Sequence, residues 1–233
     1  AVYYQLAEVI EGMAEACRAF ETPVVSGNVS LYNESAGAAI WPTPVVGMLG
    51  LLERLERRCD IGFTDEGDVI LGLGVAEARL AGSEYLSHVY GRVAGRPSID
   101  LDFEVALQRL VRELIGDGLL HSAHDLSEGG LAVAVAESAF RGGVGARVEG
   151  GWLAAAVRAD TALFGEAQSR IIVSVAPEEA AAVERRAEGA NIPIVRLGTV
   201  GGDRLVIGPI DVGLDEARAV LSAGLARALA GEG

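Results

Sequence analysis

The sequence predicts an α/β protein, with helices and strands in mixed layers around a sheet. Apolar residues recur at helical spacing over residues 3–20 and 103–118. Apolar runs of strand length, such as "SRIIVSV" at 169–175, alternate with these helical stretches. The polar stretch 53–68 has no strong period. We therefore expect two domains, over residues 1–65 and 66–233.

The first predicted domain holds a helix over 3–20 and strands over 23–31 and 44–52. Pro42 and Pro44 punctuate the loop between those strands. The chain begins without Met and already inside a helical pattern, which suggests a missing upstream piece.

The second predicted domain alternates strands with helices more regularly. A glycine follows several of the helical stretches, as is usual at a helix end. The predicted strands cover 68–74, 118–127, 169–175, 192–200 and 203–208, and the predicted helices cover 103–118, 128–143, 177–190 and 214–229.

Composition excludes several functions. The chain carries 33 acidic against 19 basic residues, a net charge of −14, which disfavours nucleic acid and anionic membranes as partners. All 19 basic residues are Arg, so neither a Walker phosphate loop nor a Schiff-base lysine can form. The longest clean apolar run, 44–52, is far shorter than the ~20 residues of a membrane helix. Two cysteines, too few for a disulfide framework, fit a reducing cytoplasm.

The stretch "TPVVSGNVSLYNES", residues 22–35, interrupts an apolar run with small and polar groups. Gly27 lacks a Cβ and lets a ligand approach the main chain. Ser26, Asn28 and Ser30 offer oxygen atoms suited to Mg²⁺ or phosphate. The structural alternative is a bulged strand with satisfied polar groups.

A second candidate is "HSAHDLSEGGLAVAVAE", residues 121–137. Asp125 ends a strand, and Glu128, Gly129 and Gly130 open a helix, whose free N–H groups suit an anion. The alternative is that Asp125 or Ser127 caps the helix while the glycines permit close packing.

Two other sets of residues are ambiguous. His121 and His124 resemble a metal pair, but side chains three apart on a strand point to opposite faces, which argues against a zinc site. Glu166 and Gln168 either line a pocket or mark a solvated entrance to the next strand.

Taken together, "TPVVSGNVSLYNES", "PTPVVGMLG", "GSEYL", "HDLSEGGLAVAVAE" and "SRIIVSV" resemble phosphoribosylformylglycinamidine synthase over essentially the whole chain. This family belongs to a superfamily that includes aminoimidazole ribonucleotide synthase. The resemblance implies an ATP-dependent carbon–nitrogen ligase of purine biosynthesis in the cytoplasm. The family fold joins two copies of an N-domain and a C-domain.

The resemblance implies that residues 1–65 are the closing part of the second N-domain and 66–233 the complete second C-domain. The missing N-terminal half would then be a partner and hold the catalytic residues, so none is expected here. The terminal helix resembles the family's C-terminus, and no glutaminase domain follows it. This suggests the small type, which works with a glutaminase subunit and a small adaptor subunit.

In the family, ATP phosphorylates the amide oxygen of formylglycinamide ribonucleotide, and ammonia then displaces phosphate. The resemblance implies that Gly27 contacts ATP, Asn28 ligates Mg²⁺ and Ser30 contacts the substrate. Asp125 and residues 128–130 would face an auxiliary site. The triplet "EAQ" at 166–168 stands where the family usually has "ESQ".

Two other functions stay open. The chain could be a stand-alone nucleotide-binding or scaffold module that pairs with another polypeptide. It could also belong to a sister enzyme such as aminoimidazole ribonucleotide synthase, against which the intact "SGNVSLYNE" argues.

Overall fold

The computed structural model describes residues 2–28, 34–155 and 158–231. The chain divides into two compact units, Ala1–Glu53 and Arg54–Gly233. The domain division at residues 65 and 66 stays a prediction.

The first unit begins with helix α1, Val2–Ala19, which confirms the helix expected over 3–20. The main-chain N–H of Thr22 donates to the carbonyl of Cys17 and closes the last turn. Further along lies a short antiparallel hairpin of β1, Glu34–Ser35, and β2, Ala38–Ala39. Ala36 and Gly37 both have positive φ, as the tightest hairpin turns require.

The strands predicted over 23–31 and 44–52 are wrong for the residues that the structure describes. Residues 22–28 and 40–52 have no regular secondary structure. Their apolar side chains are exposed, and Val45 is 96% and Leu49 99% accessible. An apolar run shows which residues suit a strand, but a strand also needs a neighbour for its backbone hydrogen bonds. No such neighbour pairs with these segments among the described residues.

The second unit is built on a sheet whose strand order is β4-β6-β3-β7-β5-β8-β9. Strands β5 and β8 are parallel, and every other neighbouring pair is antiparallel. The strands are β3, Val69–Gly74; β4, Ser122–Asp125; β5, Ala146–Val148; β6, Arg170–Val175; β7, Ile194–Val200; β8, Arg204–Ile207; and β9, Ile210–Gly213.

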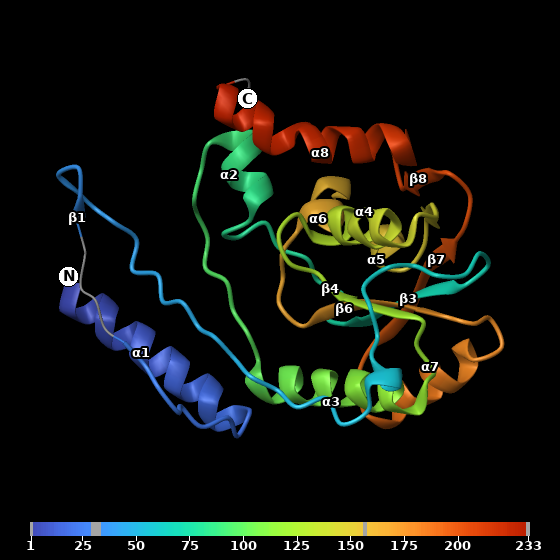
Figure 1. The fold of residues 1–233 in the computed structure, drawn as a ribbon, viewed down its shortest axis with the longest axis horizontal. Helices are drawn as coiled ribbons and strands as arrows, with labels where there is room; N and C mark the ends of the chain where they lie inside the picture. The colour runs from blue at the N-terminus through green and yellow to red at the C-terminus, as the bar shows by residue number, and fades with distance from the viewer. Residues whose placement is uncertain (1, 29–33, 156–157, 232–233) are drawn as a thin grey trace. The chain divides into compact units, whose positions relative to one another are not determined.

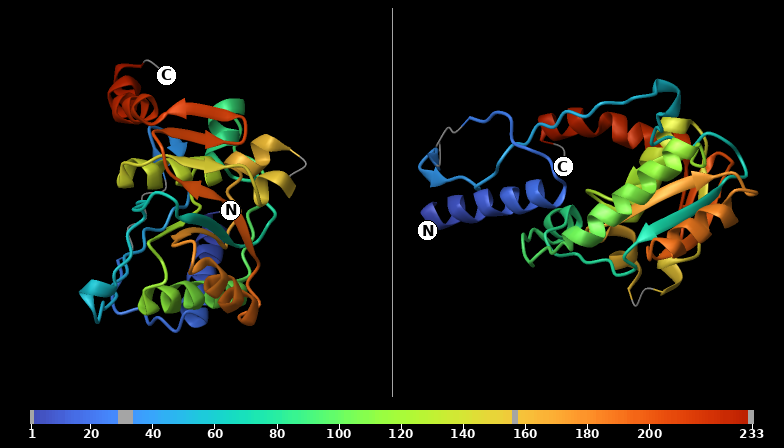
Figure 2. Two further views of the ribbon diagram at one scale, coloured as in Figure 1. Left: turned by 90° about the vertical axis from the view of Figure 1, so that its right-hand side faces the viewer. Right: turned by 90° about the horizontal axis from the view of Figure 1, so that it is seen from below.

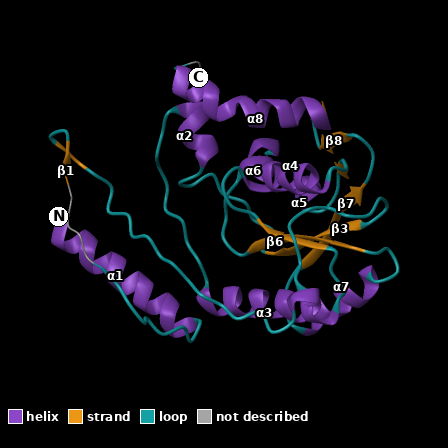
Figure 3. Ribbon diagram, viewed as in Figure 1, coloured by secondary structure: helices purple, strands orange, loops and turns teal. Residues whose placement is uncertain are grey.

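Helices cover both faces of this sheet (Figure 1). Helices α3 and α7 lie on one face, and α4, α5, α6 and α8 lie on the other, as the two further views also show (Figure 2). The helices are η1, Leu55–Arg57; α2, Glu84–Tyr90; α3, Leu101–Asp117; α4, Gly130–Gly142; α5, Trp152–Ala155; α6, Ala159–Phe164; α7, Ala180–Gly189; and α8, Leu214–Ala230. Figure 3 shows the same view with the helices in purple and the strands in orange.

The central strands are apolar on both sides because each side faces a helix layer. Leu71 and Leu73 of β3 join the core under α3 and α7. Ile70 of the same strand joins the core under α4, together with Ile172 of β6. All four side chains are at most 1% exposed.

The α/β fold class is confirmed, as are the strands and helices predicted for the second unit, within a few residues at their ends. Helices α2, α5 and α6 and strands β5 and β9 were not predicted. No helix among the described residues is both long and apolar enough to cross a membrane.

Candidate functional site

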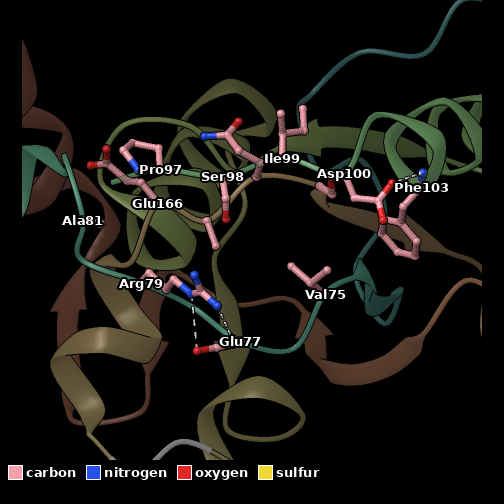
Figure 4. Close-up of a pocket in the computed structure, with 13 residues that line it drawn as sticks. Val75, Glu77, Arg79, Ala81, Pro97, Ser98, Ile99, Asp100, Phe103 and Glu166 are labelled. Carbon is pink, nitrogen blue, oxygen red and sulfur yellow. Dashed lines mark hydrogen bonds and ion pairs between the residues drawn. The ribbon is translucent and has the colours of Figure 1, made fainter. Parts of the chain in front are cut away.

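A cavity of about 300 Å³ lies where β3 ends, at the side of the sheet from which β6 starts (Figure 4). This volume is at the lower end of the range for small-molecule sites. Three segments form its wall: the loop after β3, the loop that enters α3, and the loop between α6 and β6. The lining residues are Val75, Glu77, Arg79, Ala81, Pro97, Ser98, Ile99, Asp100, Phe103, Glu166, Ala167, Gln168 and Ser169.

Main-chain hydrogen bonds hold two of these walls together. The N–H of Val75 donates to the Ser169 carbonyl over 3.1 Å, and the N–H of Glu166 donates to the Arg79 carbonyl over 2.9 Å. Gly74 makes the first contact possible, since a Cβ there would lie 1.9 Å from the Ser169 carbonyl oxygen. The φ of Gly74 is also +106°, a conformation that favours glycine. The loop after β3 and the loop between α6 and β6 are therefore held together by their main chains.

The Glu166 carboxylate joins three parts of the unit. Its Oε1 atom accepts hydrogen bonds from the main-chain N–H of Gly129, at 2.8 Å, and of Glu84, at 2.9 Å. Glu84 begins α2, and Gly129 is the N-cap of α4, so one carboxylate satisfies the free N–H groups of two helix starts. Charge-assisted bonds of this kind are among the stronger hydrogen bonds in proteins.

Both acidic and basic side chains line the cavity. Arg79 donates to the Glu77 carboxylate through Nε at 3.3 Å and Nη2 at 3.1 Å, as Figure 4 shows. These bonds raise the pKa of the Arg79 guanidinium. The Asp100 carboxylate instead accepts from the N–H of Phe103 and caps α3. Arg79 is therefore the cationic side chain among these lining residues, and it is already paired with Glu77.

A buried guanidinium supports the loop that carries Glu166. Arg170 is 2% exposed, and its Nη1 donates to the Gly165 carbonyl at 3.2 Å. The guanidinium also lies over the Trp152 ring, 4.3 Å from the ring centre. Burial lowers the pKa of Arg170 to about 10. The hydrogen bond from Arg170 thus holds the start of the 165–169 loop, and the Trp152 ring packs against the guanidinium that donates it.

The structure places the second predicted candidate beside this cavity. Gly129 and Gly130 both have positive φ, and a Cβ on Gly130 would meet the Gly165 carbonyl at 2.6 Å. The glycines therefore permit the close packing that the sequence offered as one alternative. Capping by the side chain of Asp125 or Ser127 is not observed, because the N-cap residue is Gly129 and its N–H donates to the Glu166 carboxylate.

The N–H groups at this helix start are already partly used. Gly129 donates to Glu166, and Gly130 donates to the Ser127 carbonyl at 3.1 Å. Asp125 lies at the end of β4 and accepts from the Ser127 hydroxyl. Glu128 is exposed beside them. An anion that binds the Gly129 N–H would have to displace the Glu166 carboxylate.

The histidines have separate partners. His124 Nε2 lies 2.9 Å from Glu137, and its Nδ1 lies 3.5 Å from Asp125, an ion-pair separation rather than a hydrogen bond. The Asp125 carboxylate beside it raises the pKa of His124. In turn, the His124 imidazole holds the pKa of the Asp125 carboxyl well below its usual range. His121 contacts Asp68 and Asp65 instead.

The first predicted candidate lies in the other unit. Gly27 and Asn28 are exposed in a segment without regular secondary structure. A Cβ on Gly27 would meet no atom within 4 Å, so packing within the described residues does not require glycine there. Ser30 lies outside the described residues. The roles of these three residues stay predictions.

Sequence reasoning missed several cavity residues. Arg79, Glu77 and Ser98 come from loops with no periodic signal, and nothing in their residue types marks a site. The sequence is compatible with either a pocket or a solvated strand entrance at Glu166 and Gln168, and in the structure both residues line the cavity. Their position directly before β6 was the only usable signal.

The geometry is that of an α/β domain with a small cavity, lined by apolar and charged residues, at the end of a central strand. The family model "AIR synthase related protein, C-terminal domain" matches residues 65–208, and the N-terminal domain model of the same family matches residues 2–52. The chain belongs to the AIR synthase related protein family.

Curated relatives are more specific than the family models. The phosphoribosylformylglycinamidine synthase subunit PurL of Anaeromyxobacter sp. (strain K) is 50% identical over 224 residues, which cover 92% of this chain and 30% of the relative. The PurL subunit of Moorella thermoacetica is 49% identical over 88% of this chain and 28% of its own length. The resemblance to this synthase is confirmed. The chain spans about a third of the length of these relatives.

Solved structures share the fold. PurL of Thermotoga maritima complexed with FGAR has a TM-score of 0.60 at 21% identity, over 70% of this chain and 30% of that one. The ATP complex of the same protein has a TM-score of 0.55 at 20% identity, over 70% and 27%. The structure of PurLQS from T. maritima matches with a TM-score of 0.54 at 21% identity, over 69% and 27%.

Proposed function

We propose that this chain forms part of a phosphoribosylformylglycinamidine synthase in purine biosynthesis. The enzyme would convert formylglycinamide ribonucleotide, ammonia from glutamine, and ATP into formylglycinamidine ribonucleotide, ADP and phosphate. The observation that carries this proposal is the 50% identity to a PurL subunit over 92% of the chain. The chain covers only 30% of that subunit, so we expect no activity from it alone.

The segment 22–35 would supply its part of the active site. We assign ATP contact to Gly27, Mg²⁺ ligation to Asn28 and substrate contact to Ser30. The structure is compatible with the first two roles: Gly27 leaves its main chain open, and Asn28 is exposed with a carboxamide oxygen, a ligand that Mg²⁺ accepts. When bound, Mg²⁺ would neutralise charge on the transferring phosphoryl oxygens.

The partners follow from the same proposal. The relatives are named as subunits, and one solved relative is a PurLQS assembly. We therefore propose a cytoplasmic complex with the missing N-terminal half, a glutaminase subunit and a small adaptor subunit. We also propose that Asp125, Glu128, Gly129 and Gly130 form an auxiliary nucleotide site. A phosphate would bind there by replacing the Glu166 carboxylate at the Gly129 N–H.

A chimeric enzyme tests the proposal. This chain would replace the matching part of the Anaeromyxobacter PurL subunit, and ATP-dependent formation of formylglycinamidine ribonucleotide from ammonia would be measured. We expect a turnover number within tenfold of that of the parent. An inactive but folded chimera would favour the stand-alone module, and activity on the next intermediate of the pathway would favour the sister enzyme.

Two substitutions in the chimera test the residue roles. Asn28→Asp should change the Mg²⁺ concentration required for half-maximal rate, whereas Asn191→Asp, at an exposed turn, should not. Gly27→Val should raise the KM for ATP at least tenfold, with Gly116→Val, on an open face of α3, as its control. An unchanged metal requirement or an unchanged KM would remove the corresponding assignment.

A further inference from the structure

Three metal-binding side chains converge where β3 begins. His121 Nδ1 lies 2.8 Å from an Asp68 carboxylate oxygen and 3.4 Å from an Asp65 carboxylate oxygen. One ligand atom of each residue lies within 4.8 Å of the other two. Both aspartates come from the loop before β3, and His121 directly precedes β4.

Hydrogen bonding alone leaves this cluster with excess negative charge. One imidazole nitrogen carries at most one hydrogen, so it can donate to only one of the two carboxylates. The Asp68 side chain is only 3% exposed, and no arginine among residues 2–28, 34–155 and 158–231 pairs with Asp65 or Asp68. The Thr64 hydroxyl donates to Asp65 but brings no positive charge. A buried carboxylate beside a second carboxylate is costly without a cation.

The main chain holds these residues in place before any ion arrives. The N–H of Gly67 donates to the Val200 carbonyl, and the N–H of Val200 donates to the Asp68 carbonyl, both at 2.9 Å. The loop that carries both aspartates is therefore tied to the end of β7. Such preorganisation lowers the cost of bringing the ligands together.

We propose that Asp65, Asp68 and His121 bind one divalent transition-metal ion, with Zn²⁺ as the probe. One imidazole nitrogen and two carboxylate oxygens are ligands that Zn²⁺ accepts, whereas Mg²⁺ prefers oxygen alone. Water would complete the coordination, because the Asp65 side chain is 67% exposed and that of His121 is 34% exposed. His124, which contacts Asp125 and Glu137, is not part of this site.

The site is separate from the cavity described above. Asp68 precedes the first residue of β3, and the cavity begins at Val75, after its last. A six-residue strand spans about 20 Å. The ion would therefore act as a clamp between the loop before β3 and the segment that enters β4, and it would take no part in chemistry at the cavity.

Calorimetric titration of the full chain, stripped with a chelator, tests the proposal without ATP or substrate. We expect one Zn²⁺ per chain. Asp65→Asn and His121→Gln should each weaken binding at least tenfold. Glu66→Gln changes the exposed acid next to Asp65, and His88→Gln changes an exposed histidine on α2, so both should bind as the parent does.

The controls keep the result decisive. Asp65 is exposed, so Asp65→Asn should retain the urea midpoint of the chelated parent, which separates loss of the ion from loss of the fold. Absence of stoichiometric binding would overturn the proposal. Equal affinity in Asp65→Asn and Glu66→Gln would also overturn it, because the ion would then bind elsewhere, for example at Cys17 or Cys59.

Discussion

The Glu166 carboxylate accepts a hydrogen bond from the main-chain nitrogen of Gly129, 2.8 Å away, across 37 residues of sequence. This contact places an internal anion at the start of α4, where an external anion was one of the two alternatives that the sequence left open. The same carboxylate oxygen accepts from Glu84 at the start of α2. One residue on the cavity wall therefore links the entry of two helices.

Removal of this carboxylate should weaken the second unit. Glu166→Ala leaves two main-chain N–H groups without their acceptor, and we expect a loss of about 2 kcal/mol in the free energy of unfolding. Glu166→Gln keeps an oxygen acceptor and should lose about half as much. Urea unfolding measures both. Gln168→Ala, on the same loop and exposed, is the control, and a similar loss there would contradict the role of Glu166.

The crossing at Gly74 gives a second test. In Gly74→Ala the new methyl group would lie 1.9 Å from the Ser169 carbonyl oxygen, in a backbone conformation with φ of +106°. We expect destabilisation of more than about 3 kcal/mol, since β3 and β6 must separate. Gly116→Ala, near the end of α3, meets no atom within 4 Å and should stabilise by about 0.5–1 kcal/mol. Thermal unfolding that ranks the two variants equally would contradict this account.

Arg170 should be replaceable by an apolar side chain. Its Nε and Nη2 atoms are buried, and neither has a hydrogen-bond partner among the described residues. Arg170→Met keeps contact with the Trp152 ring and removes a desolvated charge. We therefore expect its free energy of unfolding to be at least as large as that of the parent. Arg170→Ala leaves a cavity and should lose about 2–5 kcal/mol. Equal losses in both variants, by urea unfolding, would show that the charge itself is needed.

The pair of His124 and Asp125 should make stability depend on pH. The pKa of His124 is raised above 6.5, so its contribution is complete below that pH and is lost as pH rises through the raised value. The pKa of Asp125 is lowered below 3.8, so its contribution holds above that pH and is lost in stronger acid. The pair is therefore most stabilising between about pH 4 and 6.5.

Unfolding midpoints measured across pH check this window. The stability difference between the parent and His124→Gln should be largest near pH 5 to 6 and should shrink in more alkaline solution. His88→Gln, which removes an exposed histidine without an ion pair among the described residues, is the matched control. A His124→Gln difference that grows above pH 7 would contradict the assigned direction.

Periodicity predicted most of the second unit because its strands and helices bury one or both faces within the same unit. Leu71 and Leu73 of β3 and Val173 of β6 belong to two apolar runs because helices cover the sheet, and both runs are visible in the sequence. Strands β5, with the sequence ARV, and β9, with the sequence IDVG, were not predicted because each is short and contains a charged residue, so neither shows an apolar run. In the first unit, 44–52 looked like a strand, but composition does not show whether a pairing neighbour exists.

The candidate site was predictable only in part. The glycines at 129 and 130 are marked by their position at a helix start, and the structure shows that a Cβ on Gly130 would meet the Gly165 carbonyl, whereas a Cβ on Gly129 would meet the Val133 side chain. Arg79 could not be found, because its place on the cavity wall depends on the hydrogen bond between the Glu166 N–H and its carbonyl. Contacts between loops far apart in sequence leave no periodic trace.

The tight crossing of Gly74 and Ser169 also limits how this cavity can diversify. Val75 and Ser169 line it, and the backbone between them leaves no room for a new side chain at position 74. A change of ligand preference, by natural drift or in a mutant library, would therefore come from other lining positions, such as the facing loops at 77–81 and 97–100. A library restricted to those positions would sample cavity shape and charge while the β3–β6 pairing stays intact.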